Sequence, residues 1–222
     1  MLEKNKIHCM NCLEGLKQLE DNSIDLVLTD PPYGINYYSG HYKKGNPHKP
    51  IENDDTLFIP LEELWRVLKP TGTMFIFYSH KVPLIDKRVK NIIIWVKNNW
   101  TAGDLYKDFG NQYECIAFMP KEKFKLHSKR YSNVWKFDRI SPHNLLHPTQ
   151  KPESIIRRLI ETATNEGALV LDPFMGSGTT AISCKSLKRN FIGFEIDQKY
   201  IKIANARIKI FTDQKKLGDF LK

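Results

Sequence analysis

The sequence predicts an α/β protein built on a doubly wound, mostly parallel sheet of seven strands. Short runs of β-branched and aromatic residues alternate with stretches of helical period along the 222 residues. Runs such as Leu26-Val27-Leu28 and Ile92-Ile93-Ile94 are continuously apolar, which is typical of strands that helices cover on both faces. The length suits one compact domain, and we expect residues 1–222 to form it.

The individual elements follow from these patterns. The predicted strands are Lys6 to Cys9, Ile24 to Thr29, Thr73 to Tyr78, Asn91 to Val96, Glu114 to Met119, Ala168 to Asp172 and Phe191 to Glu195. The predicted helices are Leu57 to Leu68, Ile155 to Ala163 and Tyr200 to Ile208. The first helix is expected to stop at the turn sequence Lys69-Pro70-Thr71-Gly72.

Composition limits the class of protein. Apolar residues make up 41% and charged residues 27%, which excludes disordered and fibrous classes. The formal net charge of +9 favours an anionic partner such as nucleic acid or a membrane surface. No run approaches the roughly 18 apolar residues of a membrane span, and no signal-peptide pattern follows Met1, so we expect a cytoplasmic protein.

The four cysteines do not suggest a disulfide framework. Cys9 and Cys12 form a single C-x-x-C pattern, which is compatible with a redox pair or with half of a zinc site. No second pair at ligand spacing completes a zinc site. We therefore expect reduced thiols and no metal.

A glycine-rich loop follows the strand that ends at Asp172. It reads Pro173-Phe174-Met175-Gly176-Ser177-Gly178-Thr179, and the next strand ends in Glu195. Such a loop brings the backbone close to a ligand, and an acidic strand end accepts ribose hydroxyls, so the pattern predicts a nucleoside-cofactor site. The loop lacks the lysine of a nucleotide-phosphate loop, and Asp172 to Met175 separates the strand from the first glycine, against a NAD site.

The strand Ile24 to Thr29 delivers Asp30-Pro31-Pro32-Tyr33 at its tip. The prolines stiffen the turn, so the Asp30 carboxylate and the Pro31 carbonyl become fixed acceptors beside the flat Tyr33 ring. This arrangement suits a planar amine. The alternative is a Pro-Pro turn that merely ends a strand with a solvent-facing aromatic side chain.

Together these motifs resemble those of S-adenosylmethionine-dependent DNA amino-methyltransferases of the β group. The resemblance rests on DPPY at 30–33, HPTQKP at 147–152 and the FxGxG loop at 174–178, in that order, and covers about residues 5–210. It implies a Rossmann-like, circularly permuted methyltransferase fold with S-adenosylmethionine as cofactor. It also implies transfer of a methyl group to an exocyclic amine of a flipped base in double-stranded DNA.

The resemblance assigns site residues by position. The implied catalytic residues are Asp30, Pro31, Pro32 and Tyr33. The implied cofactor-binding residues are Asn11, Cys12, Asp30, His147, Thr149, Gln150, Lys151, Asp172, Phe174, Gly176, Ser177, Gly178, Thr179 and Glu195. Asn11 stands where the family commonly has an acidic residue near the adenine, and Cys12 is expected to pack beside it.

Two segments break the alternation of strands and helices. Residues 34–55 lack a period and are expected to form a loop after the catalytic motif. Residues 121–146 are expected to be an inserted target-recognition segment, because residues 121–158 contain ten Lys or Arg and only three acidic residues. The predicted DNA-binding residues are Tyr37, Lys43, Lys44, Lys125, Lys129, Arg130, Lys136 and Arg139. The alternatives are an uninvolved loop and a solvated basic face.

Within the family, a motif that begins with Asp is associated with adenine N6, so we expect a site-specific adenine methyltransferase. A cytosine-N4 enzyme is the alternative within the same chemistry. A non-catalytic nucleic-acid-binding module that kept the fold is the alternative of another class. The family also makes a homodimer and a partner restriction endonuclease plausible.

Overall fold

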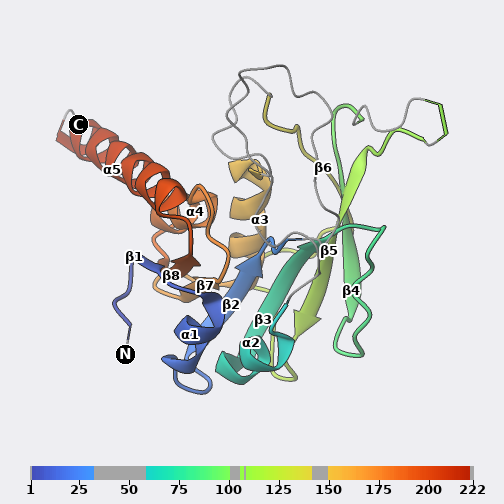
Figure 1. Ribbon diagram of the computed structural model, residues 1–222, viewed down its shortest axis with the longest axis horizontal. Helices are drawn as coiled ribbons and strands as arrows, with labels where there is room; N and C mark the ends of the chain where they lie inside the picture. Colours follow the sequence, from blue (N-terminus) through green and yellow to red (C-terminus); the bar gives the residue numbers. More distant parts are fainter. Residues whose placement is uncertain (1, 33–58, 101–105, 108, 142–149, 221–222) are drawn as a thin grey trace.

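The computed structural model describes residues 2–32, 59–100, 106–107, 109–141 and 150–220, the last of these with side chains to residue 214. One sheet runs through this part of the chain (Figure 1). Its strands are β1 (Lys6–Cys9), β2 (Ile24–Thr29), β3 (Leu68–Tyr78), β4 (Asn91–Val96), β5 (Tyr113–Pro120), β6 (Val134–Lys136), β7 (Leu169–Asp172) and β8 (Asn190–Glu195).

The strand order is β1-β8-β7-β2-β3-β5-β4-β6, and only β5 runs antiparallel to its described neighbours. The predicted fold class, a mostly parallel doubly wound sheet, is confirmed. The predicted count of seven strands was too low because β6, with three residues, is too short to show a period.

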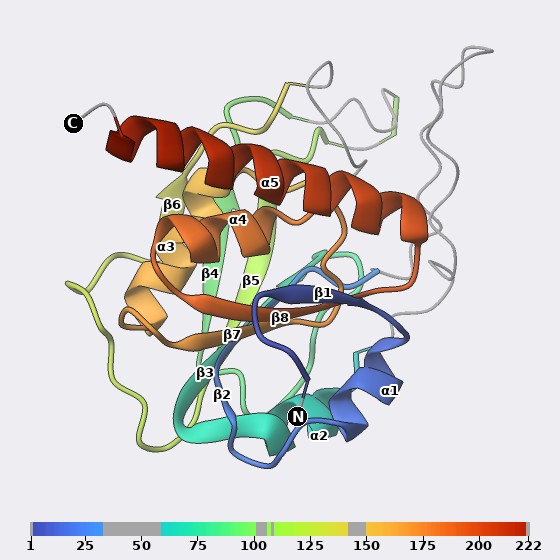
Figure 2. The same ribbon diagram turned by 90° about the vertical axis from the view of Figure 1, so that its left-hand side faces the viewer.

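Helices cover both faces of the sheet, as Figure 2 shows from its edge. The helices α1 (Cys12–Lys17) and α2 (Leu61–Val67) lie on one face. The helices α3 (Glu153–Ala163), α4 (Thr179–Ser186) and α5 (Gln198–Phe220) lie on the other. The predicted helix over Leu57 to Leu68 was wrong at both ends. Ile59 and Pro60 are not helical and α2 begins at Leu61, and α2 stops at Val67 because β3 begins at Leu68 and runs through the predicted turn.

The second half of β3, from Met74 to Tyr78, shows why its sequence is continuously apolar. Phe75 and Phe77 pack into the core under α3 and α4, whereas Met74 and Ile76 pack into the core under α1 and α2. Successive side chains of a strand point to opposite faces, so a strand buried on both faces needs apolar residues at every position. No helix in the described part of the chain is both long and apolar enough to cross a membrane.

The strand order reverses between β2 and β7. From β2 the chain continues to β3 on one side, and from β7 it continues to β8 on the other. Ligands of open α/β sheets bind where two such strands end, because their following loops diverge there. The segments after Thr29 and after Asp172 therefore leave from neighbouring strands at one edge of the sheet, which we call the carboxyl edge.

Helix α1 approaches the sheet closely at Gly15, where an added Cβ would overlap the buried Phe194 ring. We expect Gly15→Ala to destabilise the protein by about 1 to 3 kcal/mol, since overpacking outweighs the helix propensity gained. Urea unfolding measures the change, with the exposed neighbour Glu14→Ala as control. An unchanged midpoint for Gly15→Ala would contradict the close packing.

Candidate active site

The catalytic motif begins at the tip of β2. Asp30 follows Thr29 directly, and Pro31 is buried beneath the carboxyl edge. The ammonium of Lys151 lies 2.6 Å from Oδ2 of Asp30 and forms an ion pair with it. Tyr33, the predicted stacking ring, lies outside the described residues, as do Tyr37, Lys43 and Lys44.

The glycine loop links β7 to α4 through a tight turn. Gly178 N donates to Met175 O at 3.0 Å, and Met175 N donates to Phe194 O at 2.9 Å. Gly178 has a φ of 83°, and an added Cβ would lie 2.8 Å from the Cβ of Ala204 on α5. Any side chain there would meet both backbone strain and a neighbouring helix, so the turn requires glycine.

Glu195 ends β8 beside this loop. Its Oε2 accepts from Gly176 N at 2.8 Å, and its Oε1 accepts from Asp197 N at 2.9 Å. Burial raises the pKa of the Glu195 carboxyl above its usual value, although these backbone donors act in the opposite direction. A partly buried acceptor beside a close-packed glycine turn fits the hydroxyls of a nucleoside, as the sequence predicts.

Asp172 organises the start of the same loop from within the core. Its Oδ2 accepts from Thr180 Oγ1 at 2.6 Å, and its Oδ1 accepts from Phe174 N at 3.1 Å. Only 5% of Asp172 is exposed. Burial raises its pKa to about 7, and the negative charge of Asp30 contributes to the rise although the two hydrogen bonds oppose it. Asp172 therefore ties the loop to α4.

Ser177 and Thr179 are buried at the start of α4, and a residue that the sequence did not indicate lies against them. Arg207 of α5 donates to the Ser177 carbonyl and, at 3.1 Å, to Ser177 Oγ. Burial lowers the pKa of Arg207. Nothing in the helical pattern of α5 distinguishes Arg207 from the other basic residues of that helix. The structure makes it a brace for the glycine loop.

Asn11 and Cys12 lie after β1, next to the end of β8. Asn11 is the N-cap of α1, because its side-chain oxygen accepts from Leu13 N at 2.9 Å. Capping of α1 accounts for an asparagine at this position. A contact between Asn11 and the adenine stays a prediction. Cys12 is buried, and burial raises the pKa of its thiol. No group of three or more metal-ligating side chains occurs among the described residues.

The HPTQKP segment reaches the catalytic tip through its lysine. His147 and Thr149 lie outside the described residues, whereas Gln150 and Lys151 precede α3. Lys151 is only 7% exposed and lies beside Asp30. The resemblance to the family implies that Lys151 contacts the cofactor, and no sequence pattern indicates its contact with Asp30.

Two further charged residues of this region were missed. The Lys151 ammonium lies 3.3 Å from Oε2 of Glu114, and Oε1 of Glu114 lies 2.7 Å from the ammonium of Lys97. Glu114 and Lys97 are single charges in or next to predicted strands, so no spacing indicated them. Only the antiparallel pairing of β5 with β4 brings them together.

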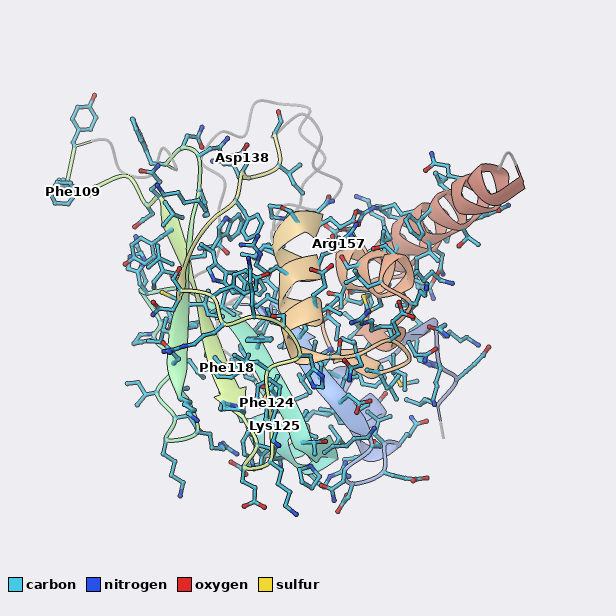
Figure 3. All side chains as sticks on the ribbon, turned by 180° about the vertical axis from the view of Figure 1, so that it is seen from behind. Phe109, Phe118, Phe124, Lys125, Asp138 and Arg157 are labelled. Atoms are coloured by element: carbon cyan, nitrogen blue, oxygen red, sulfur yellow. The ribbon has the colours of Figure 1, made fainter. Side chains whose placement is uncertain are left out.

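The basic segment divides between two edges of the sheet. Arg139 lies at the carboxyl edge, where its backbone N donates to Asn98 Oδ1 at 3.3 Å, just after β4. Lys125 follows β5 at the opposite edge, where Lys123 N donates to Pro70 O at 3.1 Å. Figure 3 shows Asp138 and Lys125 at opposite ends of the molecule. The structure thus places Lys125 away from the predicted site.

The remaining basic residues of the segment lie between these ends. Lys136 is exposed on β6, and Arg130 is exposed further along the segment. The Lys129 ammonium lies 5.4 Å from the centroid of the Tyr131 ring. Arg158 of α3 packs its guanidinium against three rings, at 5.0 Å from Tyr131, 5.6 Å from Trp135 and 4.6 Å from Phe137. Part of the positive charge counted in the sequence therefore anchors the segment to α3.

Comparison with known proteins identifies the family. A family described as DNA methylase, N6_N4_Mtase, matches residues 24–206. The chain belongs to this family. The methylase is 34% identical over 234 residues to the type II methyltransferase M.HpaI of Haemophilus parainfluenzae, covering 91% of this chain and 74% of that protein. It is 31% identical over 242 residues to the DNA adenine methyltransferase YhdJ of Escherichia coli, covering 90% of this chain and 81% of that protein.

Solved structures agree with this assignment. A complex of M1.HpyAVI with SAM is similar to the methylase with a TM-score of 0.64 and 28% identity, covering 91% of this chain and 98% of that one. The cytosine-N4-specific PvuII DNA methyltransferase has a TM-score of 0.70 at 18% identity, covering 96% of this chain and 92% of that one, which supports the fold alone. The family predicted from the three motifs is confirmed.

The buried Asp172 makes stability depend on pH. A carboxyl whose folded pKa of about 7 exceeds its unfolded value of about 3.9 binds its proton more tightly in the folded state. Its contribution to stability is complete below about pH 4 and is lost as the pH rises to 7. We expect Asp172→Asn to remove this loss. The free energy of unfolding of the variant, relative to that of wild type, should therefore rise by about 2 to 4 kcal/mol between pH 5 and pH 8.

Urea unfolding at pH 5, 6, 7 and 8 measures this difference, with Glu161→Gln as an exposed control on α3. A constant difference between Asp172→Asn and wild type across the series would show that Asp172 titrates normally.

Proposed function

We propose that the methylase transfers a methyl group from S-adenosylmethionine to the N6 amine of an adenine that is flipped out of double-stranded DNA. The observation that supports this most directly is the arrangement of β2 and β7. These neighbouring strands carry the Asp30 motif and the glycine loop to the same edge, near enough for the charge of Asp30 to affect the pKa of Asp172. An acceptor for an amine therefore lies next to a nucleoside site.

The cofactor proposal rests on the glycine loop together with Glu195. The backbone of residues 176–178 and the Glu195 carboxylate would hold the nucleoside end, and Arg207 keeps Ser177 in place. S-adenosylmethionine supplies an electrophilic methyl group on its sulfonium. The SAM complex of M1.HpyAVI, which shares 28% identity with this chain, supports the choice of cofactor.

The substrate proposal rests on the acceptors at the tip of β2. An exocyclic amine donates two hydrogens, which the Asp30 carboxylate and the Pro31 carbonyl would accept. Acceptance localises the nitrogen lone pair, and holding that nitrogen about 3 to 3.5 Å from the methyl carbon supplies much of the acceleration. The base has to leave the helix stack to reach such a site. The name of YhdJ, DNA adenine methyltransferase, favours adenine over cytosine.

Removal of the Asp30 carboxylate tests the chemical step. We expect Asp30→Ala to lower the single-turnover methylation rate at least about 100-fold, because a preorganised acceptor matters most as the nitrogen gains positive charge. The assay uses a duplex that wild type methylates, and mass spectrometry identifies the methylated nucleoside. A near wild-type rate would remove Asp30 from the mechanism. N4-methylcytosine as the product would support the cytosine alternative, and the absence of any methylated base would support a non-catalytic module.

The DNA contact is proposed for the carboxyl edge. Arg139 lies there, and its Nη1 donates to Asn99 Oδ1 at 3.3 Å, so its guanidinium is positioned beside the end of β4. Lys136 on β6, Arg130 and Lys129 are exposed, and we propose that they also contact the DNA. Lys125 lies at the opposite edge, so we do not propose that it contacts the DNA.

This difference between the two edges provides a matched pair of variants. We expect Arg139→Ala to weaken DNA binding by about 1 kcal/mol or more, with a salt slope smaller by about 0.9 if Arg139 contacts a phosphate. We expect Lys125→Ala to leave both quantities unchanged. Fluorescence anisotropy with a labelled duplex at several salt concentrations measures them. A larger effect of Lys125→Ala than of Arg139→Ala would place the DNA on the other edge.

Our proposals on assembly rest on the sequence and on the relatives of the chain. A short recognition segment contacts few base pairs, which supports our proposal of a homodimer, and the type II name of M.HpaI supports our proposal of a partner restriction endonuclease. Sedimentation of the protein with and without DNA tests the first proposal.

A further inference from the structure

Four side chains of alternating charge form a line at the carboxyl edge. Asp30 pairs with Lys151 at 2.6 Å, Lys151 with Glu114 at 3.3 Å, and Glu114 with Lys97 at 2.7 Å. Their side chains are between 8% and 20% exposed. We call these four residues the charge line. It ends at the carboxylate that we propose to act on the amine.

The charge line carries no net charge, which makes its burial tolerable. An isolated buried ion costs several kcal/mol, whereas a paired one recovers part of that cost from its partner. Burial alone would lower the pKa of the Lys151 ammonium, but Asp30 and Glu114 together raise it above its usual value. Burial alone would raise the pKa of Glu114, but Lys151 and Lys97 hold it below its usual value. Lys151 and Glu114 therefore stay ionised.

Each member comes from a different part of the fold. Asp30 follows β2, Lys151 precedes α3, Glu114 lies in β5, and Lys97 follows β4. Two hydrogen bonds between Lys97 and Gln112, at 2.8 Å and 3.0 Å, close the ends of β4 and β5 beneath the line. The pairing of β4 and β5 thus fixes the position of Glu114. Because this carboxylate is fixed, it can fix the position of the Lys151 ammonium.

Aromatic rings enclose the two cations. The Lys151 ammonium lies 5.2 Å from the centroid of the Phe77 ring, and the Lys97 ammonium lies 5.4 Å from the centroid of the Trp95 ring. An ammonium over a ring face is attracted to it and is shielded from water. These contacts restrict where the Lys151 side chain can go. The ammonium is confined between two carboxylates and a ring.

We propose that Lys151, held in place by Glu114, is a positioning residue for the Asp30 carboxylate during methyl transfer. The proposal rests on the proposed function of Asp30. It differs from the expectation that Lys151 contacts the cofactor, because the partner of the ammonium is the carboxylate at the tip of β2.

The ammonium acts on Asp30 in two ways. It fixes the direction of the carboxylate by binding Oδ2. It also favours the ionised form, which accepts hydrogen bonds from an amine and donates none. A protonated Asp30 would present a donor toward the amine and oppose localisation of its lone pair. Lys151 therefore extends the pH range over which Asp30 can accept a hydrogen bond from the amine.

The test compares Lys151→Met with wild type at saturating cofactor. We expect the single-turnover rate at pH 7.5 to fall roughly 10- to 100-fold, as when a group that orients a reacting ligand is removed. We also expect the acid limb of the pH profile to move to higher pH, since the carboxylate loses its cation. Cofactor affinity, measured by calorimetry, should change less than 3-fold, a margin of about 0.7 kcal/mol. Lys188→Met, at an exposed ion pair, is the control.

Lys151→Arg keeps the charge but not the geometry of the ammonium. We expect the acid limb to stay near that of wild type while the rate falls less than in Lys151→Met. This variant keeps the proposal testable if circular dichroism shows that Lys151→Met does not fold. A Lys151→Arg enzyme with full rate at saturating cofactor but much weaker cofactor binding would overturn the proposal and support the cofactor contact.

A double-mutant cycle decides whether Lys151 acts through Asp30. In an Asp30→Asn background, Lys151→Met should lower the residual rate less than 3-fold, because the carboxylate that it positions is gone. Additive effects of the two changes would overturn the proposal. Glu114→Gln should lower the rate without raising the acid limb, since Lys151 then keeps Asp30 as its carboxylate partner.

The proposed function is tested separately by wild type. If wild type methylates no DNA base, the proposed function fails before any variant is compared. If it methylates cytosine, the acceptor role of Asp30 and the positioning role of Lys151 both stand.

Discussion

The pairing of β2 with β7 is the constraint on which the site depends. The register aligns Leu26 with Val170 and Val27 with Leu171. Asp25 reinforces it, because its Oδ2 accepts from Leu169 N at 2.9 Å while its Oδ1 pairs with the ammonium of Lys69 on β3 at 2.7 Å. One carboxylate thus fastens three strands. Without this pairing, the Asp30 motif and the glycine loop would belong to unconnected halves of the chain.

The fold could be predicted from the sequence because helices cover both faces of the central strands. Strand β2 is buried at every position except Asp25, so its sequence is an almost unbroken apolar run, and its predicted bounds agree with the structure. The predicted bounds of β4 also agree, although Ile92 is exposed and only Ile93 and Trp95 of this strand are buried. The same reasoning failed where an element does not bury two faces. Strand β6 is three residues long with only Trp135 buried, and β3 is exposed at Pro70 and Thr71 before it enters the core.

The site could be predicted only as far as its motifs extend. Asp172 and Glu195 end strands and Asp30 directly follows one, and a parallel sheet brings such ends to one edge, so position along the chain indicated position in space. Glu114 is the second residue of the antiparallel strand β5, whose amino end lies at the carboxyl edge, and no local sequence pattern marks that position. Lys125 was assigned by charge alone, and charge does not tell one edge of a sheet from the other.

The environments of the two carboxyls at this edge separate their roles. Asp30 has an ammonium 2.6 Å from one oxygen, whereas Asp172 accepts hydrogen bonds from a hydroxyl and a backbone amide. Burial raises the pKa of Asp172 to about 7, and the charge on Asp30 adds to this, so ionising one carboxyl disfavours ionising the other. The cation stands beside Asp30, so it favours the negative charge on the carboxyl that we propose to accept from the amine. Asp172 can then keep its proton and hold the glycine loop, since a neutral carboxyl in the core costs less than a second buried charge.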